Sequence, residues 1–526
     1  MKKSIKILAL LIVLVISVMA FVACDTEFPF FDNSGNGSTS GSGSGSGSGS
    51  DTGTGNGSTS GSGSQGKEGY YELDVYAIND LHGKFEDTDS QPGVDEMTTY
   101  LKQMASEKNT IFLSAGDMWQ GSCESGLTKG NIITDWMNDL GFAAMTLGNH
   151  EFDWGVQAIK SNIELAEFPI LAINVYDRET SQRLEGCEAS TVVDKGDVKI
   201  GIIGAIGDCY SSIEGSKTAG VYFKTDSDLT KLVKEEATRL RDEEGVDFVI
   251  YSIHDGYEDS FSSEQYKSGD LSNEKGVYYD KTLSDGYVDL VFEGHSHQNY
   301  IIKDGYGVYH LQNGGDNSKG ISHAQVLFNL NDGTARVREK NKITHSVYKN
   351  MTGDAIVGTL MEKYDDLVGT MHDPIEKNGS KRSSSVLAQT VARLYYTKGL
   401  EKWGSDSRYS GKIVLGGGSI NVRSPYNLYS GDITYAKLYM LFPFDNEIVL
   451  CSISGSKLKS RFIENGEYVT HGYNNQNISD NVTYYIVTDT WNSSYASNGL
   501  TVIDYYGDCI YARDLLAEYA KTGAFA

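Results

Sequence analysis

Five short clusters of potential metal ligands lie in the chain before residue 300, and each follows an apolar run that predicts a β-strand. The clusters are Asp80-Leu81-His82, Gly116-Asp117, Gly148-Asn149-His150-Glu151, His254-Asp255 and Gly294-His295-Ser296-His297. They contain five of the ten histidines. This mixture of carboxylate, amide and imidazole donors suits divalent metals such as Mn²⁺, Zn²⁺, Fe²⁺ or Co²⁺.

Taken singly, most of these clusters have ordinary structural explanations. Asp-x-His could form a turn, Gly-Asp could begin a helix, and Asn-His-Glu could cap one. His295 and His297 are the strongest pair, because residues i and i+2 of an extended segment point to the same side. Five such clusters at five strand ends are hard to explain as turns, so we interpret them together as a metal site.

The number of ligands is too large for a single ion. Two metals about 3.5–4 Å apart, bridged by one carboxylate, can activate a water molecule and neutralise a phosphoryl group. The bridging residue needs two free oxygens on a rigid base, and Asp117 fits this requirement.

The elements that must position these clusters alternate between strands and helices. Apolar runs such as NTIFLSAGD, FAAMTLGNHE, VDFVIYSIHD and YVDLVFEGHSH each end in a cluster, and helical segments such as NIITDWMNDLG and LTKLVKEEATRLRDEE lie among them. This alternation predicts an α/β fold whose sheets are buried by helices. Ligands of open α/β sheets bind beyond the carboxyl ends of strands, so we expect all five clusters to meet at one edge.

Near Lys349 the alternation of ligand-bearing strands and helices ends. The segment DAIVGTLMEKYDDLVG predicts a long linking helix within residues 349–377, about which two domains could rotate. Residues 378–526 have a helix of their own, SSVLAQTVARLYYTKGLEKW, and strands such as GKIVLGGG and NEIVLCSISG. We therefore expect a catalytic domain at residues 69–348 and a separate C-terminal domain at residues 378–526.

The first residues have the pattern of an export signal. A basic start, MKKSIK, precedes the apolar run ILALLIVLVISVMAFV, and FVAC ends at Cys24. Small residues before a cysteine resemble the lipobox of bacterial lipoproteins, although Phe21 replaces the more usual Leu. A transmembrane anchor is the alternative, since the apolar run is of marginal length for one. We expect a signal peptide over residues 1–24 and a lipid on Cys24 that anchors the chain at the cell surface, on the outer face of the cytoplasmic membrane.

The composition restricts what this chain could bind. Residues 25–68 are dominated by Gly, Ser and Thr, which cannot bury a core and predict a disordered linker. The net charge of −26 argues against a general nucleic-acid binder, which would carry a basic face. An anionic substrate would need strong local positive charge, which metal ions could supply. The cysteines that follow Cys24 have no CxxC spacing, so we expect most of them to be buried thiols.

In their order along the chain, the five clusters resemble the motif set of the calcineurin-like metallophosphoesterases. The longer segment LGNHEFDWG and the C-terminal block resemble the 5′-nucleotidase family within that group, over roughly residues 70–526. The resemblance implies a four-layer α/β fold, in which a β-sandwich is flanked by helices, followed by a C-terminal α+β domain that binds the substrate.

The same resemblance implies two metal ions and their ligands. One would be held by Asp80, His82, Asp117 and His297, and the other by Asp117, Asn149, His254 and His295. His150, paired with Asp153, would stabilise the phosphoryl transition state or protonate the leaving oxygen. An imidazole oriented by a carboxylate is a competent acid near neutral pH. Glu151 is expected to be structural.

The resemblance also implies residues that hold the substrate. GGGSINVRSP is similar to the family's Gly-Gly-Ile-Arg loop, so Arg423 would grip a phosphate with its bidentate fork. Either Lys381 or Arg382 matches a second family arginine. FPFDNEI is similar to a Pro-Phe-x-Asn segment, so Phe444 would stack on a base and Asn446 would hydrogen-bond to it. Tyr495 would supply the second ring. The family's Gly-Gly-Asp-Gly segment, whose Asp contacts the sugar, is missing here.

These implications predict an exported, lipid-anchored dimetal phosphohydrolase, most simply a 5′-nucleotidase that acts on nucleoside monophosphates. Because the sugar-binding segment is missing, 2′,3′-cyclic nucleotides and nucleotide sugars stay open as alternative substrates of the same site. A surface-binding protein on a decayed enzyme scaffold is the non-enzyme alternative. It predicts lost ligands, and none of the seven implied metal ligands is missing.

Overall fold

The structure is a computed structural model of the chain. It describes residues 69–87, 92–256, 287–304, 306–313, 320–419, 427–464, 468–472, 477–507 and 510–526. The predicted signal peptide, Cys24, the whole predicted linker and Arg423 lie outside these residues. Among the helices of the described ranges, none combines the length and the apolar character that crossing a bilayer requires.

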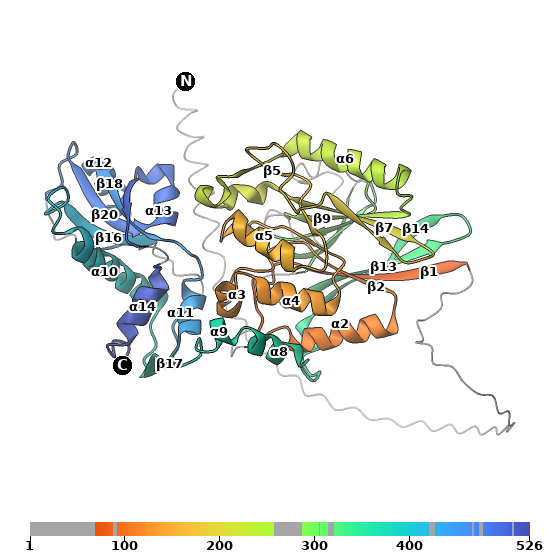
Figure 1. Cartoon of the computed structure of the whole chain (residues 1–526), viewed down its shortest axis with the longest axis horizontal. Helices are drawn as coiled ribbons and strands as arrows, with labels where there is room; N and C mark the ends of the chain where they lie inside the picture. The colour runs from red at the N-terminus through yellow and green to blue at the C-terminus, as the bar shows by residue number, and fades with distance from the viewer. Residues whose placement is uncertain are drawn as a thin grey trace, which may run out of the picture. The chain divides into compact units, whose positions relative to one another are not determined.

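Two six-stranded sheets form the centre of the N-terminal block, residues 69–348 (Figure 1). The first sheet has the order β14-β13-β1-β2-β3-β4. Its strands are β1 (Tyr70–Ile78), β2 (Thr110–Ser114), β3 (Ala144–Thr146), β4 (Ile170–Leu171), β13 (Gly320–Asn329) and β14 (Thr334–Thr344). The second sheet has the order β11-β12-β10-β9-β7-β6. Its strands are β6 (Ser190–Asp194), β7 (Lys199–Ile206), β9 (Phe248–His254), β10 (Leu290–Glu293), β11 (Asn299–Lys303) and β12 (Tyr309–Asn313).

The strands that carry the ligand clusters are parallel to one another within each sheet. Strands β1, β2, β3 and β4 are parallel in the first sheet. Strands β7, β9, β10 and β12 are parallel in the second. Three clusters therefore follow strands of the first sheet and two follow strands of the second. The prediction of a single sheet edge was wrong, because the apolar runs divide between two sheets that face each other.

Residue alternation along the strands explains the four layers. In β1, Leu73, Val75 and Ala77 point toward the second sheet, and Tyr76 and Ile78 point toward the helices. Helices α2 (Asp95–Glu107), α4 (Asn131–Leu140) and α5 (Val156–Leu165) cover the first sheet. Helix α6 (Asp226–Asp242) covers the second (Figure 1). The predicted four-layer α/β arrangement is confirmed.

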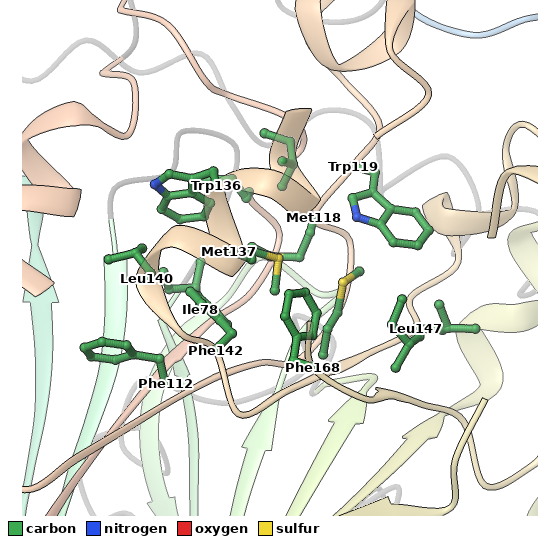
Figure 2. Packing of buried hydrophobic residues seen from close by; sticks show 14 of the residues in the cluster. Ile78, Phe112, Met118, Trp119, Trp136, Met137, Leu140, Phe142, Leu147 and Phe168 are labelled. Carbon is green, nitrogen blue, oxygen red and sulfur yellow. The ribbon is translucent and has the colours of Figure 1, made fainter. Parts of the chain in front are cut away.

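The packing between α4 and the first sheet is rich in large side chains (Figure 2). Trp136 and Met137 of α4 lie in one buried cluster with Phe112 of β2. Met118 and Trp119, which directly follow Asp117, belong to the same cluster and have no exposed surface. Full burial of side chains of this size contributes roughly 1.5–3 kcal/mol each. The core therefore anchors the loop that carries Asp117.

The C-terminal block, residues 378–526, is built on a five-stranded mixed sheet of order β19-β16-β20-β18-β21. Its strands are β16 (Ile413–Ser419), β18 (Ile448–Ser454), β19 (Tyr468–His471), β20 (Thr483–Asp489) and β21 (Thr501–Tyr505). Its main helices are α10 (Ser384–Trp403), α11 (Tyr435–Leu441), α13 (Thr490–Ser494) and α14 (Ala512–Ala520). Helices α10, α11 and α14 share a hydrophobic cluster with this sheet, as expected for an α+β domain.

The predicted linking helix is shorter than expected and is interrupted. Helix α8 (Ile356–Lys363) ends just before Tyr364, and α9 (Asp365–Val368) begins just after that residue. Tyr364 has φ −104° and ψ 17°, outside helical values, and its hydroxyl donates to Asp135 Oδ2 at 2.6 Å. This bond fixes Tyr364 against α4. Its backbone therefore does not adopt the helical conformation that would join α8 and α9 into one helix.

Asp74 of β1 provides a test of the packing. The buried carboxylate accepts from His323 Nε2 at 2.7 Å, Lys108 Nζ at 3.1 Å and Gln325 Nε2 at 3.2 Å. Asp74→Ala leaves these groups without their acceptor, so we expect the free energy of unfolding to fall by about 2–4 kcal/mol, measured by urea denaturation. Glu72→Ala on the same strand removes only a surface pair with Arg338, and we expect it to change stability by less than about 1 kcal/mol. Equal effects of the two changes would show that the buried hydrogen bonds of Asp74 contribute no more than a surface ion pair.

The same carboxylate predicts a pH dependence. Burial would raise the pKa of Asp74, but the hydrogen bonds from His323, Gln325 and Lys108 outweigh burial and lower it. A pKa that is lower in the folded state than in the unfolded state contributes stability above the ordinary aspartate range. That contribution is lost as the pH falls through the lowered pKa, and Asp74→Ala should lack this component of acid sensitivity.

Candidate metal centre

The two sheets bring the third and fourth clusters into contact with Asp117. His254, the last residue of β9, has its Nε2 atom 3.1 Å from Asp117 Oδ2 and 3.2 Å from Asn149 Oδ1. The His295 ring lies with its centroid 5.5 Å from that of His254. These four side chains are the set implied for one of the two metals.

The second implied set is brought together in the same way. His297 Nε2 lies 3.4 Å from Asp80 Oδ1 and 3.0 Å from His82 Nε2. Asp80, His82 and His297 form a group whose potential ligand atoms lie within 4.8 Å of one another, and Asp80 and Asp117 form another with His254. Asp117 thus lies near both sets, as a bridging ligand must.

Two backbone carbonyls determine which ring nitrogens face this centre. His254 Nδ1 lies 2.7 Å from the carbonyl oxygen of Ala115, and His82 Nδ1 lies 3.0 Å from that of Gln120. A carbonyl only accepts, so each Nδ1 carries the hydrogen and each neutral ring presents the Nε2 lone pair inward. An outer partner of this kind fixes the tautomer of a metal-binding histidine. The donors present therefore fit divalent metal ions.

The charges at the centre favour a cation. Burial alone would raise the pKa of Asp117, but His254 and His150 hold it well below its usual range. Burial would lower the pKa of His254, but Asp117, Asp80 and Glu151 raise it to about 10. The buried carboxylates therefore stabilise positive charge at this position, whether it is carried by protons or by metal ions.

The backbone is strained at most of the predicted ligands. Of the eight non-glycine residues with positive φ in the described chain, five are predicted metal ligands. They are Asp80 (51°), His82 (51°), Asp117 (54°), His295 (67°) and His297 (54°). A residue held in the left-handed region costs of the order of 1–3 kcal/mol, and such strain concentrates at functional sites. The surrounding structure must therefore impose these conformations.

Glu151 imposes one of them. Its fully buried carboxylate accepts hydrogen bonds from four backbone N–H groups: Asp117 (2.9 Å), Met118 (2.8 Å), Trp119 (3.1 Å) and Gly148 (2.6 Å). A Cβ atom at Gly148 would lie 2.3 Å from Asp117 Oδ1, so the two loops approach as closely as a glycine allows. Glu151 is therefore a clamp on the Asp117 loop, in agreement with its expected structural role.

His150 has a different environment from the other histidines. Its Nδ1 lies 2.8 Å from Asp153 Oδ2, and its ring centroid lies 5.2 Å from that of His82. The Phe444 ring of the C-terminal block stacks beside it, with centroids 5.8 Å apart and planes inclined by 25°. His150 is thus oriented by a carboxylate at the border between the ligand cluster and a predicted substrate residue.

A cavity of about 420 Å³ opens at this border. Both blocks line it, and the predicted site residues in its wall are Asn149, His150, Asp153, His295, Phe444 and Asn446. A volume in the range of roughly 300–1,000 Å³ is typical of small-molecule sites. Two predicted metal ligands, Asn149 and His295, therefore share one cavity with the predicted substrate residues Phe444 and Asn446.

Two predicted substrate residues are placed elsewhere. Arg382 is absent from the described cavity wall, and its guanidinium donates to the carbonyl oxygen of Phe525 at 3.2 Å. Tyr495 is 44% exposed and packs edge-on against Trp491, with ring centroids 5.2 Å apart. It is Trp491 that lines the cavity, so the structure brings this ring, and not Tyr495, to the site.

Lys217, Asp489 and Trp491 are among the residues of the wall that sequence reasoning missed. It also missed Gln120, which contacts both blocks. The Gln120 carbonyl bonds to His82, and its side-chain Nε2 donates to the carbonyl of Pro443 at 3.2 Å. Two features of the sequence could have indicated these residues. Gln120 lies close after Asp117, and Trp491 is an aromatic residue that could stack on a base.

Comparison with known proteins identifies this arrangement. Residues 73–299 match the family model of calcineurin-like phosphoesterases, and residues 367–494 match that of the 5′-nucleotidase C-terminal domain. The chain is a calcineurin-like phosphoesterase with a 5′-nucleotidase C-terminal domain. It is thus a hydrolase that acts on phosphoesters, in a family that typically binds divalent metals.

Individual relatives agree with this membership. The chain is 34% identical over 239 residues to an apyrase of Tabanus yao, a match that covers 43% of this chain but only 39% of the apyrase. It is 27% identical over 444 residues to Protein UshA of Yersinia enterocolitica, which covers 75% of this chain and 76% of that protein. A 5′-nucleotidase precursor of Thermus thermophilus has the same fold, with a TM-score of 0.61 at 18% identity, over 86% of this chain and 97% of that one.

The Glu151 clamp generates a prediction about this phosphoesterase. Glu151→Gln places an amide N–H₂ group against four backbone N–H donors and should release the Asp117 loop. Outer partners of ligands of this kind change metal affinity by about 10- to 100-fold. We expect a loss of that size in the Mn²⁺ retained after dialysis, measured by mass spectrometry of the metal. Glu185→Gln, an 86% exposed partner of Lys160, should retain the wild-type content. Full Mn²⁺ retention by Glu151→Gln would exclude the clamp.

Proposed function

We propose that this protein is a dimetal phosphohydrolase and that its principal substrates are nucleoside 5′-monophosphates. The observation that carries the proposal is one cavity lined by the His150–Asp153 pair, by Asn149 and His295 of the ligand cluster, and by the aromatic rings of Phe444 and Trp491. Relatives named 5′-nucleotidase, such as that of Vibrio cholerae at 23% identity over 74% of both chains, support the substrate class.

Seven residues of this chain would hold the metals. One ion would be held by Asp80, His82 and His297. The other would be held by Asn149, His254 and His295, and Asp117 would contribute to both. When bound, two divalent cations would lower the pKa of an attacking water molecule and offset the charge of the phosphoryl oxygens. Because the whole chain is acidic, with a net charge of −26, this local positive charge would be needed for an anionic substrate to enter.

His150 would act on the leaving side of the reaction. Asp153 accepts from its Nδ1, which fixes the ring and stabilises the protonated form. The remaining nitrogen, Nε2, can then donate its proton to the oxygen that leaves phosphorus. Leaving-group protonation of this kind contributes about 10²- to 10⁴-fold to a rate. Phe444, stacked beside the His150 ring, would place the nucleoside next to that proton.

The proposal predicts a defined effect of one substitution. We expect His150→Ala to lower kcat for AMP by about 10²- to 10⁴-fold with unchanged metal content, because His150 is not among the proposed ligands. Phosphate release by residues 67–526 with added Mn²⁺ measures this, on a panel of AMP, 2′,3′-cyclic AMP, UDP-glucose and an aryl phosphate. The exposed His471→Ala is the matched control.

The panel also separates the possible outcomes. Turnover of aryl phosphate without AMP would retain the phosphoesterase chemistry and reject the nucleotide preference. Preferred hydrolysis of cyclic AMP would identify a cyclic phosphodiesterase instead. Wild-type turnover of AMP by His150→Ala would reject the role of His150 as the acid.

Lys217 favours a second candidate substrate. This residue of η3 (Gly215–Thr218) lines the cavity, and its ammonium group has no ion pair within the described ranges. A cation here could bind a second phosphate, as in UDP-glucose or another nucleotide sugar. Lys217→Met should then raise KM for UDP-glucose more than for AMP, and equal effects would reject this assignment.

The proposed location rests on the sequence of the N-terminus. We propose that residues 1–24 are removed as a signal peptide and that Cys24 anchors the enzyme to the outer face of the cytoplasmic membrane. Cys24→Ser in the full chain should move the activity from the membrane pellet to the soluble fraction and abolish labelling by a tagged fatty acid. Labelling that persists in Cys24→Ser would reject this residue as the lipidation site.

A further inference from the structure

The wall of the cavity contains a carboxylate that the proposed mechanism does not use. Asp489 is the last residue of β20 and caps α13. Its Oδ1 accepts from the Asn492 backbone N–H at 2.9 Å and from Asn492 Nδ2 at 2.8 Å. Its Oδ2 accepts from the Tyr395 hydroxyl at 3.3 Å. Asp489 and Asn492 line the cavity together with Trp491, which lies between them in the sequence.

These bonds leave Asp489 with capacity for one more donor. An ionised carboxylate has about four acceptor positions. Asn492 occupies both acceptor positions of Oδ1, and the Tyr395 hydroxyl occupies one position of Oδ2 through a long hydrogen bond. Burial raises the pKa of Asp489 to about 6, while Asn492 and Tyr395 oppose the rise, so the group is ionised above neutral pH. The remaining position on Oδ2 is thus available to a donor on the molecule that fills the cavity.

The surroundings of Asp489 make that position selective. Ala388, Val391 and Ala512 supply apolar surface to the same cavity, and Glu214 adds a second negative charge that acts on Asp489. A ligand group with lone pairs only, such as a carbonyl, would face this carboxylate without a hydrogen bond. A buried acceptor left unpaired in this way reduces binding by about 5- to 150-fold.

We propose that Asp489 is a specificity-determining residue that requires a hydrogen-bond donor on the nucleoside part of the substrate. The inference rests on the proposed nucleotidase function and deepens it. Phe444 and Trp491 provide the aromatic surface for a base, and Asp489 lies two residues before Trp491. The donor is either an exocyclic amino group of the base or a hydroxyl of the ribose, and both present the same chemistry to the carboxylate.

Matched nucleotides separate the two sources of the donor. AMP and IMP, and likewise CMP and UMP, differ in an amino group replaced by a carbonyl. AMP, 2′-deoxy-AMP and 3′-deoxy-AMP differ in one hydroxyl each. We expect kcat/KM of the wild-type enzyme to fall at least tenfold when the donor that Asp489 binds is lost, in the amino pairs or in the hydroxyl series.

The variant Asp489→Asn tests whether this residue causes the discrimination. Asparagine caps a helix about as well as aspartate, so α13 should persist and the variant should fold. Its amide can donate as well as accept, and we expect the discrimination to shrink below threefold. Asp480→Asn, a surface partner of Lys459, should keep the wild-type ratio. Thermal unfolding of both variants checks their folding.

Each result decides the proposal. Tenfold discrimination in one series that is lost in Asp489→Asn supports it and names the donor. Less than threefold discrimination in every series of the wild-type enzyme overturns it, whether or not the variant folds. Discrimination that persists in folded Asp489→Asn also overturns it. Failure of the proposed function is distinct, because the wild-type enzyme would then hydrolyse aryl phosphate and no nucleotide.

Discussion

Two carboxylates, Asp80 and Asp117, are buried where the sheets of the N-terminal block face each other, and their charge is the constraint on which the site depends. An isolated buried carboxylate is strongly destabilising, so positive charge must be brought to it. The first sheet supplies the carboxylates, and the second supplies His254 and His297, whose Nε2 atoms lie 3.1 Å and 3.4 Å from them. The ligand set is therefore completed only when the two sheets pack. Folding of the two sheets therefore also brings the predicted ligands together.

That packing also explains why strained backbone is tolerated. Asp80, His82 and Asp117 adopt positive φ in loops whose neighbours are fixed by stronger contacts. Met118 and Trp119 are buried in the core directly after Asp117, and Glu151 binds the N–H groups of Asp117, Met118 and Trp119. Several hydrogen bonds to the Glu151 carboxyl, each contributing about 0.5–1.5 kcal/mol, together offset the strain of one left-handed residue. The predicted ligands are consequently held in position by the fold itself.

The strand-end clusters made much of this site predictable, because a ligand motif after an apolar run is a local signal in the sequence. That signal predicts that the clusters share one site. The assignment of His254 to Asp117 and of His297 to Asp80 is what the resemblance to the calcineurin-like metallophosphoesterases implies. The division of the strands between two sheets was not predictable, since residue alternation shows which face of a strand is buried and does not show which sheet it joins. The partners of His82 and His254 were hidden for another reason. Backbone carbonyls, such as those of Gln120 and Ala115, leave no mark on residue type. Trp491 was missed because the family's sugar-binding segment is absent, which removed the reference point for aligning α13.

The polar contacts of the loop that carries Phe444 are stronger within the C-terminal block than across to the N-terminal block. This difference bears on how that loop would move if the two blocks rotated. Arg513 donates to the carbonyls of Phe442 and Phe444 at 3.1 Å and 3.0 Å and pairs with Asp445, and all of these bonds lie within the C-terminal block. Across the blocks, Asp445 binds Lys129, whose side chain is 47% exposed, and Pro443 accepts from Gln120. An exposed lysine contributes at most about 1 kcal/mol to such a pair. A rotation about the Tyr364 break between α8 and α9 would therefore separate the weak contacts first. The loop that carries Phe444 would move as a rigid unit, because its own buried bonds to Arg513 would remain intact.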